Sequence, residues 1–202
     1  MKIFKIICSF FLFSFSFALA QTDTSIVPLR NIDSTIVTDV RYATTNNFTG
    51  KILYSTNKVY LRKVVAVALS KAQKDFMKNY NLRIKIYDGY RPLSVQKKMW
   101  EILPDSRYVA NPKNGSRHNR GAAVDITLVD SAGNELDMGT EFDNFTERAH
   151  SDYRNLTPLQ KKNRILLHSV MKQHGFIPLD TEWWHFDYKG WKNFSILDFP
   201  IE

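Results

Sequence analysis

The sequence has almost no cysteine. The only one among its 202 residues is Cys8, so no disulfide can form within one chain. A chain of this length can bury a sufficient hydrophobic core without such cross-links. It also has no internal repeat and no Gly/Ser-rich or Pro-rich stretch that would indicate a flexible linker. These absences predict a single domain, or a domain with extensions.

Long hydrophobic runs are also missing, except at the N-terminus. Residues 1–20 have a basic start, an apolar core and the small-x-small ending Ala18-Leu19-Ala20, the pattern of a secretory signal peptide. A membrane anchor is the alternative, but the apolar core is shorter than the roughly 20 residues that a spanning helix needs. We therefore expect cleavage after residue 20, export to the periplasm or outside the cell, and no stable membrane insertion of residues 21–202.

Charge of one sign is not concentrated in any run. The formal net charge of +8 favours anionic partners, but no basic cluster of the kind that binds nucleic acid is present. We expect no nucleic-acid partner, and an anionic polymer of the cell envelope fits the charge better. The sequence does not indicate an oligomeric state.

The spacing of apolar residues predicts both helices and strands. Helices are expected over residues 62–80, from Pro92 to about residue 103, and from Thr157 to Gly175. The expected strands cover residues 34–40, 82–88, 123–129 and 181–188. Because these elements do not alternate as βαβ units, we expect an α+β fold in which helices pack on a mostly antiparallel sheet.

Two short segments concentrate residue types that bind metals. They are SRHNRGAAVD (residues 116–125) and EWWHFDY (residues 182–188). Together they contain two histidines, aspartates and one glutamate. Zinc held by two imidazoles and one carboxylate keeps a fourth position open, and a carboxylate that is not a ligand can move a proton beside it. The same ligands also suit Fe(II), so the residues alone leave both metals open.

The spacing supports this metal site only in part. Asp125 lies in an apolar stretch, where a carboxylate is costly unless it is paired or bound to a cation. Glu182 and His185 are three positions apart, so on a regular strand their side chains would point to opposite faces. A bulge, or a strand that begins after Glu182, would bring both to one site. Single histidines and aspartates are also common in cores and turns, and the two tryptophans between Glu182 and His185 are typical of core packing.

The same segments resemble a known family. S-R-H-N-R-G-A-A-V-D followed by E-W-W-H is similar to the S-x-H-x-x-G-x-A-x-D and E-x-x-H pair of the D-alanyl-D-alanine dipeptidases. These are zinc peptidases in the wider group of D-Ala-D-Ala carboxypeptidases and Hedgehog/DD-peptidase-like folds. Further similar segments lie at residues 39–44, 47–50, 87–92, 136–140, 142–143 and 145–148. The resemblance covers most of residues 35–200.

The resemblance implies a role for each site residue. Three of them, His118, Asp125 and His185, would ligate one zinc ion per chain. Glu182 would act as general base and acid, and Arg91 would stabilise the negative charge that develops on the substrate oxygen. The candidates for holding the ends of a small zwitterionic substrate are Ser116, Tyr42, Asp88 and Asp143.

The implied function is zinc-dependent hydrolysis of D-Ala-D-Ala, or of similar D,D-dipeptides, in peptidoglycan metabolism. Residues 21–202 would form the catalytic domain. One alternative is a D,D-carboxypeptidase that trims peptidoglycan stem peptides with the same chemistry. Another is a non-catalytic domain that binds the cell envelope. The presence of Glu182 and Arg91 argues against the second alternative, because binding alone needs neither residue.

Overall fold

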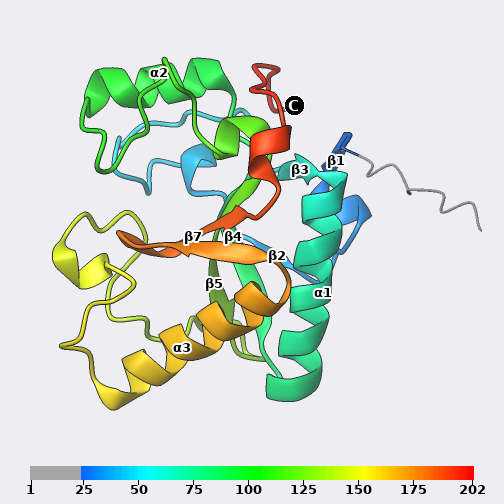
Figure 1. Ribbon diagram of the computed structural model, residues 1–202, viewed down its shortest axis with the longest axis vertical. Coiled ribbons are helices and arrows are strands. Elements are labelled where there is room, and N and C mark those ends of the chain that lie inside the picture. Colours follow the sequence, from blue (N-terminus) through cyan, green and yellow to red (C-terminus); the bar gives the residue numbers. More distant parts are fainter. Residues whose placement is uncertain (1–23) are drawn as a thin grey trace, which may run out of the picture.

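A mixed five-stranded sheet forms the centre of the protein (Figure 1), with strand order β2-β4-β5-β7-β6. The computed structural model describes residues 24–202, so the predicted signal peptide lies outside the described residues. The strands are Val37–Thr38 (β2), Arg83–Asp88 (β4), Ala123–Val129 (β5), Phe176–Leu179 (β6) and Glu182–Tyr188 (β7). The edge strand β2 pairs in parallel, and the other neighbours pair antiparallel. The predicted α+β fold with a mostly antiparallel sheet is confirmed.

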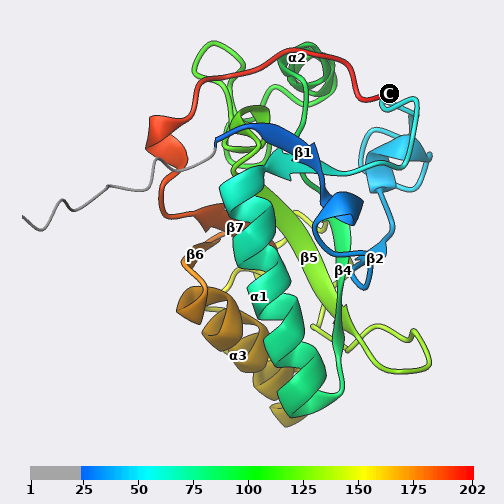
Figure 2. The ribbon, with the colours of Figure 1, turned by 90° about the vertical axis from the view of Figure 1, so that its right-hand side faces the viewer.

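Residues 24–202 contain three α-helices, and two of them pack on this sheet. Figure 2 shows α1 (Lys63–Tyr80) and α3 (Pro158–Gln173) side by side, whereas α2 (Leu93–Ile102) lies at one end of the molecule. The buried face of α1 carries apolar side chains three and four positions apart, as predicted. The first turn of α3 is closed by a capping box between Thr157 and Gln160. In α2, Pro92 precedes the first helical residue and serves as the N-cap, one position earlier than expected.

The spacing of apolar residues does not predict three short strands of the described residues. Strands β1 (Ile26–Pro28) and β3 (Tyr60–Arg62) form a separate two-stranded antiparallel pair, and β6 is the third. Each spans four residues or fewer, which is too short to show a repeating pattern. Strand β3 also runs directly into α1, so its residues look like the start of that helix.

The central strand β5 is buried along its whole length. It pairs with β4 on one side and with β7 on the other. In this register Asp125 stands opposite Asp88 of β4 and opposite His185 of β7. Residues that face each other across neighbouring strands point to the same side of a sheet, so this row gathers three polar side chains at one place. No helix in residues 24–202 is long and apolar enough to cross a membrane.

Candidate active site

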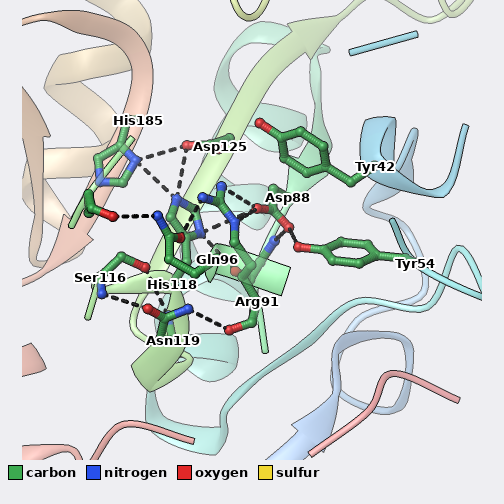
Figure 3. Close-up of polar contacts among 12 residues, drawn as sticks. Tyr42, Tyr54, Asp88, Arg91, Gln96, Ser116, His118, Asn119, Asp125 and His185 are labelled. Atoms are coloured by element: carbon green, nitrogen blue, oxygen red, sulfur yellow. Dashed lines mark hydrogen bonds and ion pairs between the residues drawn. The ribbon is translucent and has the colours of Figure 1, made fainter. Parts of the chain in front are cut away.

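Three potential metal ligands converge at this row of residues. His118, Asp125 and His185 are all buried, and one potential ligand atom from each lies within 4.8 Å of the others. His185 Nδ1 is 2.9 Å from Asp125 Oδ1 and 3.1 Å from His118 Nε2, and His118 Nε2 is 3.4 Å from Asp125 Oδ1. Figure 3 shows the three side chains pointing toward one another. Two segments 60 residues apart therefore form one metal-binding triad.

The spacing of these atoms fits one small cation. Zinc binds imidazole nitrogen and carboxylate oxygen at about 2.0–2.1 Å, so tetrahedral ligands stand about 3.4 Å apart. The observed separations of 2.9, 3.1 and 3.4 Å lie close to that value. Two imidazoles and one carboxylate leave a fourth tetrahedral position for a water molecule or a substrate oxygen.

Each histidine is held by a hydrogen bond on the side away from the triad. His118 Nδ1 lies 2.7 Å from the carbonyl oxygen of Gly89, so Nδ1 is the protonated nitrogen and Nε2 is left as the ligand. His185 Nε2 lies 2.9 Å from Asp187 Oδ1, so here Nδ1 faces the triad. Outer partners of this kind fix the tautomer and the orientation of metal-binding histidines.

The loop that carries His118 is shaped by a glycine. His118 begins a short 3₁₀ turn that ends at Gly121, which has a φ of +65°. A side chain there would also approach the backbone nitrogen of Arg62 to 3.2 Å. Only glycine tolerates both conditions, which explains the glycine in the motif. The turn returns the chain to β5 and so places His118 above Asp125.

A bulge in β7 brings Glu182 to the same site. Leu179 pairs with Glu182, yet its neighbour Pro178 pairs with Phe186, so one step along β6 matches four steps along β7. The strand begins at Glu182 itself and not after it, so of the two arrangements that the sequence left open the structure has the bulge. Glu182 Oε2 lies 3.9 Å from His185 Nδ1, close to the triad but not part of it.

Burial changes the protonation of the acidic residues here. It raises the pKa of Glu182 to about 8 and that of Asp143 to about 7. Burial acts in the same direction on Asp125, but the neighbouring His118 and His185 reverse its effect and lower the pKa of Asp125. A bound divalent cation would lower the pKa of Glu182, because positive charge favours the carboxylate.

Arg91 lines the same cavity and is held rigidly. Its Nε and Nη2 donate to Asp88 Oδ2 over 3.0 and 2.7 Å, and its Nη1 donates to Gln96 Oε1 over 2.9 Å. Asp88 is oriented in turn by the hydroxyl of Tyr54 at 2.8 Å. These bonds use three of the five N–H groups of a guanidinium, so two are left for a ligand. Burial alone would lower the pKa of Arg91, but Asp88 raises it, so the side chain stays charged.

Asp88 differs from the other predicted substrate contacts. It is 1 % exposed, and its oxygens are engaged by Arg91, Tyr54 and the backbone nitrogen of Gly89. The residues that line the cavity do not include it. The structure therefore places Asp88 behind Arg91, where it positions the guanidinium, and the expected contact with substrate is corrected accordingly.

The other predicted residues lie on the cavity wall. The cavity has a volume of about 310 Å³ and is lined by Ser116, Tyr42 and Asp143 as well as by the triad, Glu182 and Arg91. The hydroxyl of Tyr42 donates to Asp143 Oδ1 over 3.2 Å. Asp143 adopts a φ of +59°, a conformation that Asp and Asn tolerate better than most residues.

Several supporting residues are absent from the sequence prediction. Asn119 links the segment of Arg91 to the segment of Ser116, because its Nδ2 donates to the carbonyl oxygen of Arg91 and its Oδ1 accepts from the nitrogen of Ser116. Asp187 lies two positions after His185 in a predicted strand, and that spacing alone indicated a shared face. The cavity wall contains an aromatic cluster whose members come from three loops: Phe48, Tyr108 and Phe145. Loops carry no periodic signal that would have found it.

Comparison with known proteins assigns the chain to a family. The family model described as D-ala-D-ala dipeptidase, peptidase family M15, matches residues 22–199. The chain belongs to the D-Ala-D-Ala dipeptidase family. It is 37% identical over 174 residues to the D-alanyl-D-alanine dipeptidase of Escherichia coli (strain K12), which covers 86% of this chain and 90% of that protein.

Other members of the D-Ala-D-Ala dipeptidase family are also similar. The D-alanyl-D-alanine dipeptidase of Enterococcus faecium is 30% identical over 81% of this chain and 92% of its own length. Among solved structures, the vancomycin resistance D,D-pentapeptidase VanY, in a mutant complex with Zn(II), has a TM-score of 0.43 and 16% identity over 68% of this chain and 77% of that chain. The family assignment rests on the sequence relatives and the family model.

Proposed function

We propose that this chain is a zinc-dependent dipeptidase that hydrolyses D-Ala-D-Ala or similar D,D-dipeptides, as part of peptidoglycan metabolism. Family membership supports the reaction. The observation that carries the proposal is the arrangement of the site. A buried triad of His118, Asp125 and His185 shares one small cavity with a carboxylate that is not a ligand and with a fixed guanidinium.

Zinc is the ion that we propose for the triad. When bound, it would polarise the carbonyl of the scissile peptide and lower the pKa of a water molecule. The ligand set of two imidazoles and one carboxylate, with separations near those of a tetrahedron, supports this choice. Fe(II) uses similar ligands, and elemental analysis of protein purified without added metal distinguishes the two ions.

Glu182 has the position of a general base and acid. Its carboxylate stands 3.9 Å from a triad nitrogen, so a water molecule at the open position of a bound metal would lie within its reach. We assign it two successive tasks: it takes a proton from the attacking water and then passes a proton to the departing amine. A group that performs both tasks needs a pKa near the working pH, and burial moves Glu182 in that direction.

Arg91 has the position of the group that stabilises negative charge. The guanidinium is fixed by Asp88 and Gln96 before substrate arrives, so its two remaining N–H groups need no reorganisation. We propose that they donate to the oxygen of the scissile carbonyl as charge develops on it.

The wall of the cavity suits both ends of a short zwitterion. The carboxylate of Asp143 is proposed to pair with the substrate ammonium, and the hydroxyls of Tyr42 and Ser116 to hydrogen-bond the remaining polar groups. A volume of about 310 Å³ lies at the lower end of the roughly 300–1,000 Å³ of small-molecule pockets. This size favours a free dipeptide over a peptidoglycan stem peptide.

We also propose export to the periplasm or the outside of the cell. The support is the basic, apolar and small-residue pattern of residues 1–20. N-terminal sequencing of the protein released from the periplasm of an expression host should find a chain that begins at Gln21. Recovery of an intact Met1 terminus in the membrane fraction would favour an uncleaved anchor instead.

A substrate panel tests the proposed reaction directly. The purified protein should release D-alanine from D-Ala-D-Ala, a chelator should stop the reaction, and added zinc should restore it. L,L-dipeptides, L,D-dipeptides and a pentapeptide stem should react much more slowly. Faster turnover of the stem would identify a carboxypeptidase. Sedimentation with cell-wall sacculi, without hydrolysis of any substrate, would identify a binding domain.

A further inference from the structure

The two histidines of the triad are held by different kinds of partner. His118 is held by a backbone carbonyl, that of Gly89, which carries no net charge. His185 is held by the carboxylate of Asp187, 2.9 Å from its Nε2. Asp187 is buried, with 7% of its surface exposed. A buried carboxylate is costly unless a cation or several donors compensate it.

Arg117 is the cation that faces Asp187 from the other side. Its Nε lies 3.3 Å from Asp187 Oδ2, the oxygen that His185 does not use. This Nε is shielded from solvent and, among residues 24–202, has no hydrogen bond of good geometry, so the contact is an ion pair. The guanidinium lies 4.8 Å from the ring centre of Trp191, which supports it by a cation–π contact. A continuous chain of contacts therefore leads from Trp191 through Arg117 and Asp187 to His185, where it reaches the triad.

The negative charge of Asp187 explains why a cation stands beside it. An imidazole that ligates a metal through Nδ1 is neutral, with its single proton on Nε2. It can donate that proton to Asp187 but cannot neutralise the carboxylate. A bound ion would lie on the far side of the ring, whereas Arg117 is a cation whose direct ion pair with Asp187 is observed.

We infer that Arg117 and Asp187 form an outer pair that positions His185 and strengthens metal binding by the triad. Asp187 acts through His185, and Arg117 acts through Asp187, so both are positioning residues. Asp187 fixes the ring so that Nδ1 points at the metal, and Arg117 keeps Asp187 in place. The inference rests on the proposed zinc site but not on the substrate.

Zinc affinity tests the pair without reference to activity. The purified protein is stripped of metal, and its dissociation constant for zinc is measured by competition with a chromophoric chelator. Loss of an outer partner of a metal ligand typically weakens binding by roughly 10- to 100-fold, and we expect a change of this size for Asp187→Ala. Arg117→Ala should weaken binding less, because Asp187 still bonds to His185.

A double-mutant cycle separates positioning from a general effect of charge. If Arg117 acts through Asp187, then Arg117→Ala should have almost no effect in a chain that already carries Asp187→Ala. Lys192→Ala is the matched control, because it removes a positive charge near the same Trp191 ring, 5.7 Å from its centre, without touching Asp187. It should leave zinc affinity unchanged.

The outcomes are distinct. Unchanged zinc affinity in Asp187→Ala, or an equal effect of Arg117→Ala with and without Asp187, would overturn the inference alone. Wild-type protein that binds no zinc would overturn the proposed metal site as well. If Asp187→Ala fails to fold by circular dichroism, Asp187→Asn replaces it, since Asn keeps the acceptor oxygen and the shape but loses the charge that Arg117 pairs with. Asp187→Asn should then show weaker zinc binding and no further loss with Arg117→Ala.

Discussion

The floor and the wall of the cavity are built in different ways. The floor consists of strands β5 and β7 and the short turn at His118, and each metal ligand there is less than a tenth exposed. The wall consists of loops, from Tyr42 and Phe48, through Tyr108, to Asp143 and Phe145. The floor is fixed by the hydrogen bonds of a sheet, whereas the wall is held by side-chain contacts. We expect the floor to determine the chemistry and the wall to determine which substrate reaches it.

The largest effect should follow from Glu182→Gln. The amide keeps the size of the side chain but cannot take a proton, so kcat should fall by roughly 10²–10⁴-fold. Zinc content should remain at the wild-type level, because Glu182 is not a ligand in the triad. Steady-state kinetics together with elemental analysis check both statements. Loss of zinc in this variant would show that Glu182 belongs to the metal site.

The pH dependence of kcat/KM, compared between the wild type and Glu182→Gln, gives a second test of Glu182 as the general base. Proton abstraction needs the carboxylate form, so kcat/KM of the wild type should fall as the pH decreases through the pKa of Glu182. Burial places that pKa at about 8, and a bound cation lowers it, so the fall should lie on the acidic side of pH 8. The residual rate of Glu182→Gln should lack this acidic limb. A limb that persists in the variant would assign it to another group.

Arg91→Lys should have the next largest effect. Lysine keeps the positive charge but loses the planar fork that Asp88 and Gln96 hold in place. Loss of one such donor to the developing charge lowers kcat by roughly 10²–10³-fold. Arg107→Lys is the control, since Arg107 also lines the cavity but is exposed and paired with Asp105. Similar losses in both variants would contradict a specific role for Arg91.

The difference between the floor and the wall also decides how much of the site can be predicted from the sequence. Asp125 and His185 lie in stretches whose apolar pattern identifies strands, and the family resemblance completes the set with His118 and Glu182. The bulge that brings Glu182 to the site is not predictable from alternation, because that rule assumes a regular strand. Asp88 is a different case, since the family resemblance implied a substrate contact and only the packing shows that its carboxylate holds Arg91.

On the wall, Asp143→Asn should weaken substrate binding with little change in chemistry. Asparagine tolerates the φ of +59° and can keep accepting from Tyr42, so the loop should retain its shape. The substitution replaces a charge-assisted bond to the substrate ammonium, worth about 1.5–3 kcal/mol, by a bond from a neutral acceptor, worth about 0.5–1.5 kcal/mol. The difference of roughly 1–1.5 kcal/mol corresponds to a rise in KM of roughly 5- to 15-fold. N-acetyl-D-Ala-D-Ala, which has no ammonium, should react equally with both proteins. A loss of equal size with this substrate would show that Asp143 does not bind the amino end.

The smallest effect should follow from Tyr108→Ala, which opens the aromatic cluster. Tyr108 stacks on Phe145 with ring centres 4.6 Å apart, and Phe48 contacts the ring of Phe145 edge-on at 5.4 Å between ring centres. Such a pair contributes about 0.5–1.5 kcal/mol, so the melting temperature should fall only slightly. The ratio of kcat/KM for a stem peptide to that for the dipeptide should rise several-fold, because the wall closes the cavity around the substrate. Tyr80→Ala is the control, since Tyr80 is an exposed aromatic residue on α1 that does not line the cavity. If the ratio is the same in both variants, the limit on substrate length lies in the floor, and the division between the two regions fails.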